Sequence, residues 1–133
     1  MTITKRMLRD YRKNKREIPV LRLELEEMLT TPMGLGTIMD YKTGYPRAQT
    51  IIGIDESRYA KRQDVLRRKE NEVMAVEEWI EAIADGQARY VFRAFYVNGM
   101  SWDRIAKKIG YKGNPDYVRI KIRDKYLLDH HIK

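Results

Sequence analysis

Glycine divides the last third of the chain into short segments, and this division constrains the fold more than any other feature of the sequence. Asn98-Gly99 separates residues 87–97 from residues 101–109, and Gly110 separates these from residues 114–127. Asn and Gly tolerate the left-handed backbone with which many helices end. Apolar residues recur within each segment at helical spacing, which indicates one buried face per helix. The pattern predicts short helices joined by turns.

The second and third of these segments also carry helix start signals. Ser101 precedes residues 102–109 and belongs to the residue types preferred at an N-cap. Asn114 is followed by Pro115, and proline is favoured at the first position of a helix. Both helices are therefore expected to begin where these residues stand.

A small residue lies where the second helix has to approach its neighbours. Two helices that cross over a short turn need a small side chain at the contact, and Ala106 is in that place, four residues before Gly110. Ile105 and Ile109 are expected in the core. The residues predict a helix-turn-helix, although three-helix units that serve only as scaffolds share this pattern. Tyr111-Lys112-Gly113 makes the turn longer than the tight form allows, because Gly110 and Val118 are eight positions apart.

Charge suggests the partner of such a unit. The chain has 27 Lys and Arg against 19 Asp and Glu, a net charge of +8, and a pI near 9.7. This balance favours a polyanion, and a helix in the major groove with a first helix near phosphates is the usual geometry. Val118, Ile122 and Tyr126 are expected to face inward, with Arg119 and Arg123 flanking the outward side. We expect double-stranded DNA to be bound by Ser101, Arg104, Lys107, Lys108, Lys112, Asn114, Tyr117, Arg119 and Lys121.

The rest of the chain predicts an all-α protein in three parts: a helical arm and loop (1–53), a long amphipathic helix (54–86) and the helix-turn-helix unit (87–133). Residues 2–29 have helical periodicity that Pro19 should break or kink. Gly and Pro in residues 30–53 indicate a loop. A helix from Asp55, as N-cap, to about Ala84 should stop at Asp85-Gly86. Its apolar stripe could pack on either neighbour or on a second copy: Tyr59, Leu66, Val73, Val76, Ile80 and Ile83.

The many cations of the N-terminal half have two interpretations. Basic residues crowd the first half of residues 2–29, and acidic residues follow them. They form either the solvated faces of a helix pair or a basic arm laid along phosphates. The basic cluster Arg58, Lys61, Arg62, Arg67, Arg68 and Lys69 is more typical of a solvated face.

Several classes of function are disfavoured. The chain has no cysteine, which excludes disulfides and thiolate zinc sites. No apolar run approaches the roughly 20 residues of a membrane span, and no secretory signal is evident, so a cytoplasmic protein is expected. Glu24, Glu26, Glu27 and Glu77-Glu78 suit solvated helices, and His130-His131 lack a third ligand. We expect no catalysis, no metal and no cofactor.

At the C-terminal residues the chain resembles phage regulators of the RinA/ArpU type. These have a C-terminal helix-turn-helix similar to sigma factor region 4 and are associated with activating late phage genes. The resemblance covers about residues 75–128. The resemblance implies DNA binding at a phage promoter in a bacterial host, with contact to host RNA polymerase. The chain departs from the family pattern at Gly113-Asn114-Pro115, where the usual turn is shorter. It rests on Trp79 through Arg89, Phe95-Tyr96, Gly99-Met100-Ser101-Trp102-Asp103-Arg104-Ile105-Ala106 and Gly110-Tyr111.

Two other DNA-binding functions fit the same residues. A small terminase subunit recognises packaging sites and assembles into rings, and the long helix could build such a homo-oligomer. Terminases usually place the DNA-binding unit first, whereas here it comes last. A non-specific DNA-binding protein would need only the basic charge.

Overall fold

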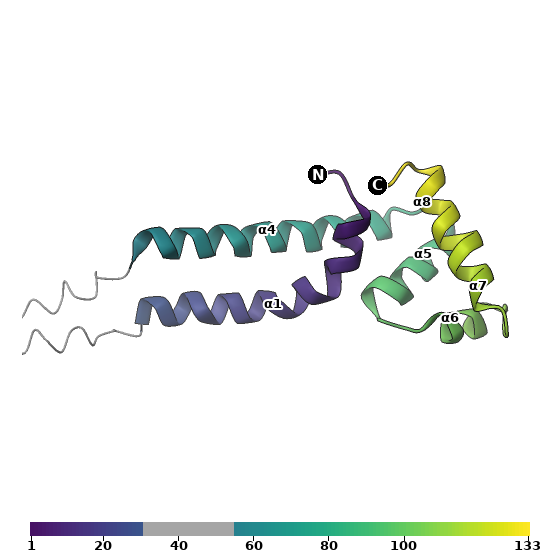
Figure 1. Cartoon of the computed structure of the whole chain (residues 1–133), viewed down its shortest axis with the longest axis horizontal. Coiled ribbons are helices and arrows are strands. Elements are labelled where there is room, and N and C mark those ends of the chain that lie inside the picture. Colours follow the sequence, from purple (N-terminus) through teal and green to yellow (C-terminus); the bar gives the residue numbers. More distant parts are fainter. Residues whose placement is uncertain (31–54) are drawn as a thin grey trace, which may run out of the picture. The chain divides into compact units, whose positions relative to one another are not determined.

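A computed structural model describes residues 1–30 and 55–133 of the chain. All regular structure in these ranges is helical, which confirms the all-α fold class (Figure 1). The predicted loop over residues 30–53 lies outside the described residues except for Thr30, which ends a helix. The chain divides into two compact units, Met1–Lys15 with Asn71–Lys133, and Arg16–Glu70. We call them the terminal unit and the hairpin unit.

Helix α1 (Lys5–Thr30) begins where Thr4 caps it and runs through Pro19 without a break. Thr4 Oγ1 accepts a hydrogen bond from the Met7 amide at 3.2 Å. Of the break or kink predicted at Pro19, the break is wrong: the proline removes one main-chain donor, but Ile18 and Leu21 beside it are buried and favour continuation. The carbonyl that loses its helical donor belongs to Lys15, where the terminal unit ends on this helix.

Helix α4 (Glu56–Glu81) begins at the predicted cap, since Asp55 Oδ1 accepts a hydrogen bond from the Arg58 amide at 3.1 Å. Helix α4 ends at Glu81, whereas the sequence predicts an end at about Ala84. Asp85 Oδ1 accepts bonds from the amides of Gln87 at 2.9 Å and Ala88 at 3.3 Å, so it caps the next helix, α5 (Gly86–Phe92). Asp85-Gly86 therefore begins helix α5 and does not end helix α4. A carboxylate satisfies free N–H groups at a helix start, and Gly86 does not take a positive φ.

In the hairpin unit the second half of α1 lies antiparallel to the first half of α4. Glu17 pairs with Lys69 at 2.8 Å, and Glu24 pairs with Arg62 at 2.6 Å. The residue number rises by seven along α1 and falls by seven along α4, as it does for two antiparallel helices. Arg22 pairs with Glu70 at 2.6 Å. Between the charged edges the apolar side of α1 is buried at Ile18, Leu21 and Leu25. Three cations of this unit, Arg22, Arg62 and Lys69, thus hold the two helices side by side.

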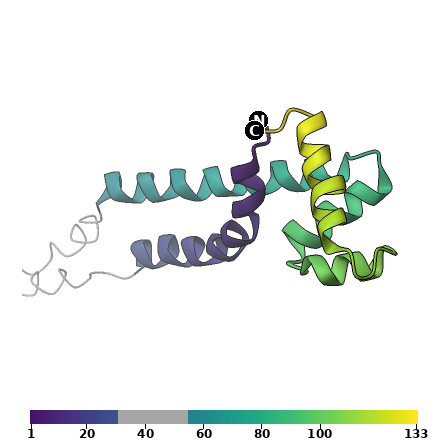
Figure 2. The same cartoon turned by 45° about the vertical axis from the view of Figure 1, so that its right-hand side comes forward.

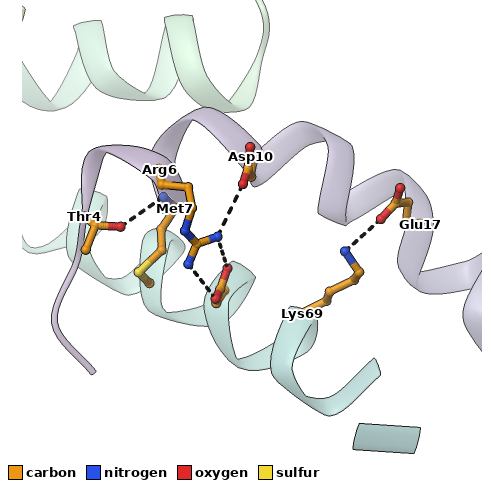
Figure 3. A network of polar contacts seen from close by, with 7 residues as sticks. Thr4, Arg6, Met7, Asp10, Glu17 and Lys69 are labelled. Atoms are coloured by element: carbon orange, nitrogen blue, oxygen red, sulfur yellow. Dashed lines mark hydrogen bonds and ion pairs between the residues drawn. The ribbon is translucent and has the colours of Figure 1, made fainter. Parts of the chain in front are cut away.

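In the terminal unit the start of α1 is bound to the second half of α4. The Arg6 guanidinium donates to both carboxylate oxygens of Glu72, at 2.9 and 3.3 Å, and to Asp10 at 3.3 Å. Figure 3 shows the Arg6 side chain reaching from α1 toward α4, with Asp10 on its own helix as a further partner. Four residues of the predicted apolar stripe lie in this unit and are buried, the last of them just after the end of α4: Val73, Val76, Ile80 and Ile83.

A buried phenol makes a second link between these helices. The Tyr11 hydroxyl donates a short hydrogen bond to Glu77, which Lys15 also contacts at 3.2 Å. Burial, followed by the Glu77 carboxylate, raises the pKa of Tyr11. The same hydrogen bond is the main reason that the pKa of Glu77 is lowered below 4.5. Glu77 is therefore more stable as a carboxylate in the folded chain than in the unfolded one.

Replacement of Tyr11 by Phe should lower the free energy of unfolding by about 1 kcal/mol at neutral pH, because a half-exposed carboxylate is deprived of one donor. A depressed pKa gives stability that is present above the unfolded value and lost as pH falls through the folded value. The difference between wild type and variant should therefore shrink below pH 4.5. Urea unfolding at several pH values measures it, and an equal difference at neutral pH and at roughly pH 3 would contradict the assignment.

The C-terminal helices contain two π-helical stretches that the sequence did not predict. After α5 the chain continues as η1 (Arg93–Val97), then α6 (Trp102–Lys108), α7 (Pro115–Tyr117), η2 (Val118–Asp124) and α8 (Lys125–Asp129). Segments η1 and η2 are π-helical, and the Asn98 amide bonds to the Arg93 carbonyl at 3.0 Å, five residues back. Residues 115–129 thus form one continuous helical rod of α7, η2 and α8, which we call the third helix (Figure 1).

A compact core joins α5, η1, α6 and the third helix. Ile105, Ala106 and Val118 are fully buried and pack with Val91 and Ala94. Figure 2 shows α6 lying across one end of the third helix. Ile109 and Ile122, both predicted inward, pack against this core, while Tyr126 lies against Phe92 with ring centres 5.4 Å apart. The prediction that Ala106 lies at the helix contact is confirmed.

Replacement of Ala106 by Leu should destabilise the terminal unit by about 1–3 kcal/mol, because a fully packed site has no room for three more carbon atoms. Thermal unfolding followed by circular dichroism measures the change. Ala84, which is exposed, provides the matched control, and its change to Leu should alter stability by less than about 0.5 kcal/mol. Equal effects at the two sites would show that Ala106 is not at a tight contact.

Candidate nucleic-acid interface

The turns on both sides of α6 use the left-handed backbone that the sequence predicted. Gly99 has φ of +68° and Gly110 has φ of +92°. Ser101 is the N-cap of α6, and its hydroxyl oxygen accepts a bond from the Arg104 amide at 3.2 Å. Ser101 is a predicted DNA contact, and this bond also gives its side chain a structural role. The short helix is thereby fixed at both ends.

The outer face of α6 carries three exposed cations. Arg104, Lys107 and Lys108 are exposed, and each lies three or four residues from another, so they share the side opposite Ile105 and Ala106. Within residues 1–30 and 55–133, no carboxylate forms an ion pair with any of them. We call these three residues the α6 basic face. Their charges stay available to an external anion.

The turn after α6 is held by the main chain. The Tyr111 amide donates to the Ala106 carbonyl and the Asn114 amide donates to the Tyr111 carbonyl, both at 2.8 Å. Gly113 supplies a positive φ of +82°. Asn114 stands at the N-cap of α7 as predicted, but its side chain makes no capping bond. Lys112 is exposed at the tip of this turn, so both predicted contacts keep their polar groups on the surface.

The exposed side of the third helix combines apolar and basic groups. Tyr117 and Ile120 are 39% and 42% exposed, and Lys121 is exposed beside them. Tyr111 stacks on one face of Tyr117 with ring centres 4.7 Å apart, which fixes the orientation of the phenol. Arg119 pairs with Asp116 at 3.1 Å within its own helix. Tyr117 and Lys121 are the members of the predicted set that the structure leaves most available here.

Arg123 lies inside the unit, so its predicted position flanking the outward side is wrong. Its guanidinium lies 5.0 Å from the Trp102 ring centre and 5.6 Å from that of Phe95. It donates to the Tyr96 hydroxyl at 2.9 Å and to Asp124 at 2.6 Å. The π-helical geometry of η2 changes which side chains share a face, and it turns Arg123 toward the aromatic rings. Arg123 thus connects the third helix to Trp102 of α6 and to Phe95 and Tyr96 of η1.

Replacement of Arg123 by Ala should lower the free energy of unfolding by about 2 kcal/mol, because the alanine can neither pack on the two rings nor donate the charged hydrogen bond. The matched control is Arg119→Ala, which removes an exposed pair within one helix and should cost less than about 0.5 kcal/mol. Chemical denaturation of both variants measures the difference. A cost at Arg119 as large as that at Arg123 would contradict this division of roles.

The described residues form no candidate metal site. They contain no group of three or more His, Asp or Glu placed to hold a metal ion. His130 stacks on Tyr126 at 3.8 Å between ring centres, and its Nδ1 lies 3.0 Å from the Tyr126 carbonyl oxygen. Among the helices of this part of the chain, none is long and apolar enough to cross a membrane.

Comparisons of the chain with protein-family models, with curated proteins and with solved structures found no match.

Proposed function

We propose that this protein binds double-stranded DNA through α6 and the third helix. The observation that carries the proposal is the α6 basic face, in which three cations that form no ion pair with any described residue stand opposite a fully buried side. A first helix that lies near phosphates while the next helix enters the groove has this distribution of charge. Phosphate contacts would come from Arg104, Lys107, Lys108 and Lys112.

The third helix would read the bases. Its exposed side offers an oriented phenol at Tyr117, an apolar surface at Ile120 and a long cation at Lys121. A major groove admits one helix and presents both hydrogen-bonding groups and thymine methyl groups. Asn114 and Arg119 stand at the start of the same helix and would contact the groove edge or the backbone.

Sequence-specific binding at a promoter is the biological function that we infer, and its support is the resemblance to phage regulators of the RinA/ArpU type. Within that proposal the chain would act in a bacterial cytoplasm, as an activator and with contact to RNA polymerase. Packaging-site recognition by a terminase subunit and binding without sequence preference are the other outcomes of the test.

Substitutions in α6 and in the third helix should affect binding differently. Lys107→Ala with Lys108→Ala should weaken binding to all duplexes alike and reduce the slope of log affinity against log salt by about 0.9 for each phosphate that is no longer neutralised. Lys121→Ala or Tyr117→Ala should instead reduce the preference between sequences by about 1–3 kcal/mol. Fluorescence anisotropy on specific and scrambled duplexes measures both. Identical behaviour of the two sets would refute the assignment of the third helix to the groove.

The specific duplex comes from selecting fragments of the source genome at low and high salt and sequencing those retained. Enrichment of a promoter-proximal site that survives high salt supports the regulator. A peak beside packaging genes supports the terminase subunit. Uniform recovery that disappears at high salt means that the protein binds without reading sequence, and the regulator proposal would then be wrong.

A further inference from the structure

A second group of exposed cations lies on α1. Lys5, Arg9, Arg12 and Lys13 are spaced by four, three and one residues, so they occupy one side of the helix over more than two turns. The opposite side carries the buried residues Met7, Leu8 and Tyr11. We call the four cations the α1 basic stripe. All four are exposed and belong to the terminal unit.

Ion pairing separates this stripe from the other cations of α1. Arg6 and Lys15 neighbour the stripe in sequence, yet both point to α4 and are neutralised by Glu72 and Glu77. No residue of the stripe forms an ion pair within the ranges 1–30 and 55–133. Four like charges on one solvated face repel one another, so the folded chain gains nothing from gathering them there. An external polyanion would relieve that repulsion.

One contact connects the stripe to the proposed DNA-binding helices. The Arg12 guanidinium lies over Gly99, so closely that a Cβ atom on Gly99 would come within 2.5 Å of Arg12 Cζ. Gly99 is in the turn that leads to Ser101, the N-cap of α6. The stripe therefore lies, at Arg12, against the turn that leads into α6.

We propose that the α1 basic stripe binds the phosphate backbone of the duplex next to the segment contacted by α6. The inference rests on the proposed function and extends it by adding a second, sequence-independent contact. Lysine and arginine side chains release condensed counterions when they approach phosphates, and each such approach adds to the salt dependence of binding. The stripe would strengthen binding to every sequence and lengthen the bound segment of DNA.

The test uses the full chain and mixed-sequence duplexes of increasing length. Arg9→Ala with Lys13→Ala removes two exposed charges, and Ala favours the helix, so α1 should persist. The matched control, Lys61→Ala with Arg68→Ala, removes the same charge from exposed positions on the hairpin unit that form no ion pair with any described residue. Circular dichroism verifies that both variants are folded. Lys107→Ala with Lys108→Ala reports separately on the α6 basic face.

The stripe variant should reduce the salt slope by about 1.8, which is about 0.9 for each of two phosphates, while the control leaves the slope unchanged. It should also reach full affinity on a shorter duplex than wild type does. An unchanged slope in the stripe variant, together with a reduced slope in the α6 variant, would overturn this inference and leave the proposed function intact. Equal reductions in the stripe and control variants would overturn it too, because net charge alone would then explain binding. Absence of salt-dependent binding by wild type would overturn the proposed function itself.

Discussion

Burial of Ile105 and Ala106 is the interaction on which the packing of the C-terminal helices depends. Helix α6 has seven residues, too few to be stable alone, so packing has to hold it in place. Only a side chain as small as alanine lets it approach η1 and the third helix so closely. The direction of the α6 basic face follows from this contact, because residues opposite a buried side in a helix must face solvent. Core packing and the candidate binding surface are two sides of the same helix.

Features governed by a few neighbouring residues could be predicted from the sequence. The caps at Asp55 and Ser101 and the positive φ of Gly99 and Gly110 depend on local backbone geometry, and all were found where expected. Asp85 shows where such rules fail. An aspartate and a glycine between two helices can end the first or begin the second, and only the bonds to Gln87 and Ala88 decide between the two. Pro19 was likewise outweighed by the burial of residues on both sides of it.

Features set by tertiary contacts could not be predicted in this way. A π-helical stretch costs hydrogen-bond geometry locally and persists only where packing over-determines it, so no residue spacing indicates η1 or η2. The consequence is largest at Arg123. A regular α-helical pattern puts that cation on the edge of the outer face, whereas the structure holds it between Trp102, Phe95 and Tyr96. The aromatic residues nearby are the sequence feature that could have predicted this position of Arg123. A partly buried guanidinium needs aromatic rings to pack on and a hydroxyl to accept its hydrogen bond.

The distribution of ion pairs bears on function more than the net charge of +8 does. Exposed pairs such as Arg22–Glu70 contribute little to stability, about 0–1 kcal/mol each, so their number says little about how firmly the helices hold together. Their effect is to neutralise cations where they stand. Pairing neutralises several cations where α1 and α4 meet. Within the described ranges, no ion pair neutralises the α1 basic stripe, the α6 basic face or the hairpin-unit residues Lys61 and Arg68. Counterion release depends on the charges that reach phosphates, and a total summed over the chain does not identify them. The folded arrangement of carboxylates thus decides which of the described cations are neutralised by ion pairs, and the total charge of the chain does not.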